Sequence, residues 1–290
     1  GKIATATTRQ LMARPSLQQF VDVSLASAFV GSLMPGYTDR NRDHGLAVHG
    51  RIGARNTWSY LFTVTNGDGG DGTRNVLDGR TSDNLAFSGR INHAFLESTG
   101  YEEGALRQTT CESYGEIGAW AYYYADRADL PHTQITDALR FGVDVALGYR
   151  GFTLTGAATW GSDENGAGDD ADYAAYLVQL GYLIPGTGWE LAARWSLVDV
   201  DNPLPALAPL SGQQQPLGHG AVSEIALGLT WYLNGHGNKV GVDRAMLRGH
   251  DPGSRLLFDP YTGHQGARGT TGSGDDTYGF LLRLQWQLAL

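Results

Sequence analysis

The chain has 290 residues, a net charge of −9 and a pI near 5.3. This acidic balance argues against a nucleic-acid-binding protein, which would carry a basic surface. No run approaches the ~20 apolar residues that a membrane-spanning helix needs, and with one cysteine, Cys111, the sequence offers no disulfide framework and no cysteine-rich metal site.

Segments in which every second residue is apolar follow one another along the chain, and this two-residue period indicates β-strands. The clearest is 139–150, where Leu139, Phe141 and Val143 alternate with Arg140 and Asp144. The eleven predicted strands are 45–52, 57–64, 84–92, 118–124, 139–150, 151–160, 173–184, 189–198, 222–233, 239–247 and 278–290. A tilted strand that crosses a bilayer needs about 9–11 residues, whereas strands of soluble sheets average nearer 5–6. Strand length therefore favours a membrane protein.

The connections between these segments alternate between tight and long. Tight turns are predicted at 53–56, near Arg150–Gly151, at 185–188 and at 234–238, and long loops at 65–83, 125–138, 161–172, 199–221 and 248–277. Only the connection 93–113, which holds Cys111, is long although it falls on the side where the other connections are tight, and we interpret it as an insertion. Short turns on one side and long loops on the other are typical of outer-membrane barrels. The sequence thus predicts an all-β fold, a transmembrane antiparallel β-barrel.

The alternative is a soluble sandwich or barrel, which also alternates apolar and polar residues. Aromatic residues near the predicted strand ends speak against it, because Tyr and Trp collect at the two interfaces of a bilayer. These residues are Trp58, Tyr149, Trp160, Tyr182, Trp189 and Trp231.

Several stretches resemble the phosphate-selective porin O and P family, in order along the chain. They are "SLQQFVDVSLAS" (16–27), "RDHGLAVHGRI" (42–52), "YLFTVTNGDG" (60–69), "AAYLVQLGYLIPGTGWELAARWSLVD" (174–199) and "EIALGLTWYLNGHGNKVGVD" (224–243). The resemblance implies a sixteen-stranded, homotrimeric porin of the bacterial outer membrane, of which this chain would hold about twelve strands as a single domain, 1–290. About four N-terminal strands would then be absent, and residues 8–44 would form a loop that narrows the pore.

The function implied by this resemblance is passive diffusion of small hydrophilic solutes, with a preference for anions such as phosphate. It requires no cofactor and no enzyme activity. Its partners would be the lipid bilayer, two further copies of the chain and small anions, with no nucleic acid.

Alternation predicts a set of arginines that face the pore and guide anions, because a guanidinium binds phosphate or carboxylate in two places. They are Arg51, Arg90, Arg140, Arg150, Arg194 and Arg283. The open alternative is that they pair with Asp144, Glu190 and Glu224 on the same face, which would brace the wall and select weakly.

The stretch "GKIATATTRQ" departs from the family, with Ala4 where a constriction lysine is expected and Ala6 where a proline is expected. Lys2, Arg9 and Arg14 lie nearby in the sequence and could substitute. We therefore expect a general porin with anion preference more than a strongly phosphate-selective one.

Two acidic stretches, 66–72 and 162–172, resemble calcium loops but lack the spacing of a calcium-binding motif, and no metal site is predicted. Two rival functions stay open. One is a structural outer-membrane barrel that conducts little and packs against a partner through small residues such as Gly156, Ala158 and Ala193. The other is an outer-membrane hydrolase, for which no Ser–His–Asp arrangement can be argued from residue order.

Overall fold

The computed structural model describes most of the predicted strands and part of the N-terminal region. The described residues are 2–4, 7–13, 18–21, 23–33, 42–53, 57–65, 85–98, 101, 103–104, 106, 113–125, 135–165, 170–202, 220–250 and 277–288. Among them, no helix has both the length and the apolar character needed to cross a membrane.

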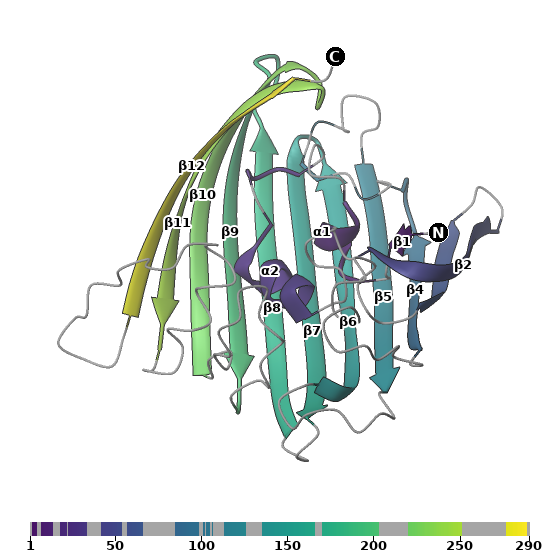
Figure 1. Ribbon diagram of the computed structural model, residues 1–290. Helices are drawn as coiled ribbons and strands as arrows, with labels where there is room; N and C mark the ends of the chain where they lie inside the picture. The colour runs from purple at the N-terminus through teal and green to yellow at the C-terminus, as the bar shows by residue number, and fades with distance from the viewer. Residues whose placement is uncertain are drawn as a thin grey trace.

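Twelve strands form one antiparallel sheet in which each strand is hydrogen-bonded to the next in sequence (Figure 1). The strands are β1 (Lys2–Ala4), β2 (Arg42–Ile52), β3 (Trp58–Thr65), β4 (Ala86–Ala94), β5 (Ser113–Ala125), β6 (Ile135–Tyr149), β7 (Phe152–Asn165), β8 (Asp170–Leu183), β9 (Trp189–Val200), β10 (Gly220–Asn234), β11 (Asn238–Gly249) and β12 (Thr277–Leu288). The sheet curves strongly, and two short helices, α1 (Arg9–Met12) and α2 (Leu25–Leu33), lie on its concave side. Within the described residues, β12 pairs only with β11.

All eleven predicted strands are present, and most extend a few residues beyond the predicted ends. The largest correction concerns 161–172, which was predicted to be a long loop. β7 continues to Asn165 and β8 already begins at Asp170. Both strand ends consist mainly of polar residues, so the sequence shows no apolar–polar alternation there by which a strand could be recognised. The predicted tight turns at Arg150–Gly151, 185–188 and 234–238 all lie at one end of the sheet, which we name the turn end. We name the opposite end the loop end.

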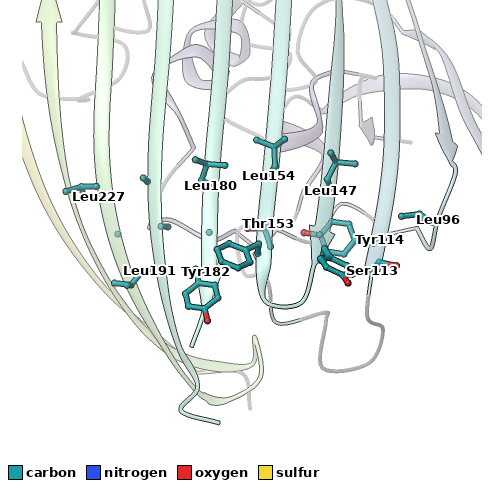
Figure 2. A pocket seen from close by; sticks show the side chains of 17 residues that line it. Leu96, Ser113, Tyr114, Leu147, Thr153, Leu154, Leu180, Tyr182, Leu191 and Leu227 are labelled. Carbon is teal, nitrogen blue, oxygen red and sulfur yellow. The ribbon is translucent and has the colours of Figure 1, made fainter. Parts of the chain in front are cut away.

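The two faces of the sheet differ in polarity. We call the face against which α1 and α2 lie the inner face, and the opposite one the outer face. Large apolar side chains on the outer face are exposed, for example Leu180 at 51% and Leu227 at 64%. Leu147, Leu154 and Leu180 are register neighbours on three adjacent strands and line an apolar groove of ≈ 760 Å³ on this face (Figure 2). An exposed apolar surface of this extent needs an apolar environment.

Aromatic rings gather on the outer face near the turn end. Trp189 and Trp231 stack with ring centroids 5.2 Å apart, and Phe152 and Tyr182 stack at 4.4 Å. In each pair, one ring follows one tight turn and the other precedes the next, so the register of the neighbouring strands brings them together. The placement matches the predicted cluster of aromatic residues at strand ends.

The described residues between 7 and 33, which we call the inner segment, pack on the inner face. α2 contacts β8 and β9, and Phe29 meets the ring of Tyr173 edge-on at 5.2 Å between centroids. Leu25, Phe29 and Val30 belong to a buried apolar cluster with Leu177 and other residues of the sheet, which we call the wall. The fold thus holds this segment against the wall through side chains that are almost fully buried.

Candidate functional site: the polar inner face

The inner face carries a series of ion pairs between arginines and carboxylates of the wall. Arg90 pairs with Asp144, Arg140 with Asp163, Arg194 with Glu224 and Arg283 with Asp243, with nitrogen–oxygen distances of 2.7, 2.8, 2.6 and 2.6 Å. Arg9 of the inner segment pairs with Glu116 at 3.3 Å. Each wall member lies on the buried side of its strand, as the alternation of that strand requires.

The Arg90–Asp144 pair bridges two strands that are not neighbours. Arg90 on β4 reaches over β5 to Asp144 on β6 and makes two hydrogen bonds of 2.7 Å to the carboxylate. Gly118 on β5 lies between them, and a Cβ there would overlap Arg90 Nη2 and come within 2.8 Å of Asp144 Oδ1. The absence of a side chain at Gly118 is therefore what allows the pair to form.

Tyr101, from the connection between β4 and β5, lies beside two guanidinium groups. Its ring centroid is 5.4 Å from the Arg9 guanidinium carbon and 5.3 Å from that of Arg90. Three nitrogens of these two groups, Arg9 Nε, Arg9 Nη2 and Arg90 Nε, are buried without a hydrogen-bond partner among the described residues. The aromatic face stabilises the two cations where hydrogen bonds do not.

The carboxylates of the wall also hold the backbone of the inner segment. The backbone N–H groups of Arg9, Val21 and Leu25 donate to Asp144 Oδ2, Asp243 Oδ2 and Glu224 Oε2 at 3.2, 2.9 and 2.6 Å. Each of these carboxylates therefore serves a wall arginine and a backbone N–H at once. Hydrogen bonds to a charged acceptor are about twice as strong as neutral ones, so the inner segment is fixed to the wall at three separated points.

A second polar centre lies towards the turn end around Gln19. Its side chain donates to Glu190 Oε1 at 2.8 Å and accepts from Gln179 Nε2 at 2.8 Å, while its backbone N–H donates to Glu103 Oε2 at 3.1 Å. Tyr232 also donates to Glu190, at 2.5 Å. Gly181 makes room for Gln19, since a Cβ there would overlap Gln19 Nε2. Lys239 completes the centre by donating to the backbone oxygen of Gln18 at 2.5 Å.

The predicted pore-facing arginines divide into two groups. Arg90, Arg140, Arg194 and Arg283 lie on the inner face and are all in ion pairs. Two of them have partners that the pairing alternative named, Asp144 and Glu224, whereas Arg140 and Arg283 pair with Asp163 and Asp243, which it did not name. Arg51 is exposed near the end of β2, in register with Ser59 of β3.

The prediction for Arg150 as part of a wall strand needs correction. Arg150 lies in the tight turn after β6, with φ +47°, and its guanidinium carbon is 5.1 Å from the ring centroid of Tyr149. The alternation continues to Arg150 in the sequence, but the chain already reverses there.

The predicted constriction residues are less completely described. Arg9 is buried in α1 and paired with Glu116. Lys2 begins β1, but its side chain is outside the described part of the structure, as is all of Arg14.

Sequence reasoning missed several members of the site. Asp163 was assigned to a loop and Asp243 was not considered as a partner, although its alternation with Val240 and Val242 places it on the inner face. Glu103 and Tyr101 come from the connection that we interpreted as an insertion. Glu190 was expected among the arginine partners, but it bonds Gln19 and Tyr232.

The balance of charge on the inner face limits what it can do. Among the described residues, the buried side chains include five basic ones and seven acidic ones. The basic ones are Arg9, Arg90, Arg140, Arg194 and Lys239, and the acidic ones are Glu103, Glu116, Asp144, Asp163, Glu190, Glu224 and Asp243. No group of three or more metal-ligating side chains is found in the described chain. Such a wall offers a polar, charge-compensated surface and not a row of free cations.

A meandering antiparallel sheet with an apolar outer face, a charged inner face and a segment packed inside is the fold of the porins. Among solved structures, the chain is similar to an anion-selective porin from Comamonas acidovorans, with a TM-score of 0.56 and 11% identity over 98% of this chain and 72% of that one. It also matches a porin refined at 1.8 Å resolution, with a TM-score of 0.47 and 10% identity over 82% of this chain and 61% of that one.

A further match is the outer membrane channel DcaP of Acinetobacter baumannii, with a TM-score of 0.46 and 12% identity over 84% of this chain and 62% of that one. No family model matches the sequence, and no curated protein does either.

We expect Gly118→Ala to lower the free energy of unfolding by about 3–5 kcal/mol, because its methyl group displaces Arg90 and leaves two buried charges apart. Unfolding by guanidinium chloride, followed by tryptophan fluorescence in micelles, measures this change. Gly156→Ala on the outer face is the matched control, since its Cβ would lie 3.3 Å from Val145 Cγ1 and 3.9 Å from Leu177 O. Equal effects of the two variants would contradict the assigned role of Gly118.

Glu224→Gln should destabilise the protein by a similar ~3–5 kcal/mol, because Arg194 then stays buried without its counter-charge. The same variant should expose the inner segment to proteases, since Leu25 loses a charged acceptor. Removing both charges with Arg194→Met/Glu224→Met should recover only part of the stability, since no charge stays unpaired but the buried Leu25 N–H loses its acceptor. Asp199→Asn on the exposed outer side is the control, with an expected change within about 0.5 kcal/mol.

Proposed function

We propose that this chain is the pore-forming part of a bacterial outer-membrane porin, which allows small hydrophilic solutes to diffuse passively. The observation that carries the proposal is the opposite polarity of the two faces. Exposed leucines and aromatics on the outer face suit lipid, and buried charges on the inner face suit a water-filled lumen. The structural likeness to an anion-selective porin supports the same function.

We further propose that the inner segment narrows the lumen, as the predicted constriction loop 8–44 would. Its described residues lie on the inner face and are held there by carboxylates of three strands. A segment fixed in this way sets a constant aperture. The homotrimer and membership of the phosphate-selective porin O and P family rest on the resemblance of the sequence.

The preference for anions depends on basic side chains that are not neutralised by neighbours. The four wall arginines in ion pairs each face a carboxylate at 2.6–2.8 Å, so their fields cancel largely within the wall. Arg51 is exposed instead, near the end of its strand. We infer that the anion preference is weak and is set by exposed residues such as Arg51.

Single-channel recording in planar bilayers tests the proposed function directly. The purified chain should open defined, ohmic channels without added cofactor. A folded protein that inserts and never conducts would favour the structural barrel over the porin, and ester or peptide hydrolysis by the same preparation would favour an enzyme.

Val178→Arg tests the lipid-facing role of the outer face, because Val178 is exposed near the middle of β8. A cation in the middle of a lipid-facing strand costs about 2–4 kcal/mol near the bilayer midplane, so folding into vesicles should weaken by this amount. Val178→Ala, which keeps the site uncharged, separates this cost from that of lost apolar contact. Unchanged folding of the arginine variant would place this face in water.

Arg51→Gln should lower the anion-to-cation permeability ratio by up to about fivefold, because a unit charge acting at ~4 Å in water contributes about 1 kcal/mol. Reversal potentials under a salt gradient give this ratio. The control is Arg140→Met/Asp163→Met, which removes a neutral pair of the wall, keeps the carboxylates that hold the inner segment and should leave the ratio unchanged. A larger shift in the control would assign selectivity to the paired arginines.

A further inference from the structure

Two arginines of β11 lie on the outer face, where apolar side chains dominate. Val242, Arg244 and Arg248 are exposed on this side, while Asp243 and Leu247 between them are buried on the inner side. Among the described strands β4–β12, Arg244 and Arg248 are the only lysine or arginine side chains on the outer face. The acidic side chains of that face lie on β6–β9 near the loop end, and they are Asp137, Glu164, Asp170, Asp172 and Asp199.

Arg244 lies near the middle of β11, in register with Leu227 of β10 and Leu282 of β12. These two leucines are 64% and 78% exposed. No carboxylate of the described residues pairs with Arg244. An arginine on a lipid-facing surface is least favourable at the bilayer midplane and nearly neutral at the interface. Its position therefore calls for an anionic partner that can reach an apolar surface.

The side chain of Arg244 leans towards the loop end. Its guanidinium carbon lies 5.9 Å from the ring centroid of Phe280, a residue that pairs with Met246 and so lies two register positions nearer the loop end. With a rise of ~3.4 Å per residue and a tilt of ~40°, Arg244 starts ~13 Å below the end of the strand. Leaning in this direction moves the charge towards the membrane interface.

Arg248 lies next to the last residue of β11, at the loop end, in register with Tyr278 and Ser223. Its guanidinium carbon is 5.9 Å from the ring centroid of Tyr278. Ser223 Oγ is 3.1 Å from His250 Nε2, which adds hydroxyl and imidazole groups to the same corner of the outer face. These groups together are hydrogen-bond donors of the kind that bind phosphate oxygens.

We propose that Arg244 and Arg248, with Ser223 and Tyr278, bind the phosphorylated headgroup of a glycolipid of the outer leaflet, whose acyl chains cover Leu227 and Leu282. This proposal rests on the proposed membrane location, in which the loop end faces outwards as the long loops of outer-membrane barrels do. Phosphate at the level of Arg248 meets both guanidinium groups, since Arg244 leans towards it. The apolar neighbours of Arg244 suit acyl chains, which a soluble anion lacks, and the acidic side chains of β6–β9 confine the site to β10–β12.

Binding of lipid A to the full chain in neutral detergent tests the proposal, with native mass spectrometry as the measurement. Bis-phosphorylated lipid A should bind, and Arg244→Gln/Arg248→Gln should weaken its binding about tenfold or more, since each guanidinium–phosphate contact is charge-assisted. Dephosphorylated lipid A should bind both proteins equally weakly. Arg51→Gln removes one positive charge elsewhere and should leave binding unchanged.

Three outcomes would overturn the proposal. Undiminished binding of lipid A to the double variant would show that the two arginines do not hold the phosphate. Binding of inorganic phosphate as tight as that of lipid A would show an anion site that needs no acyl chains. Loss of a stable oligomer in the double variant, with lipid binding unchanged, would assign this surface to contact with a second copy.

Channel recordings of the same variant keep this proposal separate from the proposed function. The double variant should conduct like the unaltered chain, because both side chains lie outside the lumen. Lipid binding by a chain that never conducts would contradict the proposed porin function but would still support the proposed lipid site.

Discussion

The structure depends on carboxylates of the wall that accept two kinds of donor at once. Asp144, Glu224 and Asp243 each take an arginine of the sheet and a backbone N–H of the inner segment. Because an isolated buried charge costs several kcal/mol, neither donor can leave without weakening the other contact. The sheet and the inner segment are therefore stabilised as one unit, and polar groups that would otherwise be costly to bury become the link between them.

Glycine residues in two strands make this arrangement possible, because the side chains that form it pass directly over the backbone of these strands. An ion pair across β5 and a glutamine inserted at β8 both need a wall without side chains, at Gly118 and Gly181. Both positions lie in strands, where glycine weakens the strand on its own. The favourable contacts that it admits offset that weakness, so the high glycine content of the chain, 41 residues, reflects more than turns.

The strands could be predicted because a two-residue period is a local signal that every strand repeats. The site could be predicted only in part, because its partners are distant in sequence. Arg90 and Asp144 are 54 residues apart, and their meeting depends on the registers of two strand pairs and on Gly118 between them. Glu190 shows the limit clearly, since its face was predicted correctly but its partners, Gln19 and Tyr232, follow from the path of the inner segment.

Charged side chains have opposite surroundings on the two faces, and strand parity alone decides which surroundings a given residue meets. Asp243 and Arg244 are adjacent in β11, yet Asp243 pairs with Arg283 inside while Arg244 lies among leucines outside. A slip of one residue in the register of β11 would exchange them. Arg244 would then face Arg283, a repulsive pair, and a carboxylate would enter the apolar face. The register of β11 is thus specified electrostatically on the inner side, and the outward arginine follows from it.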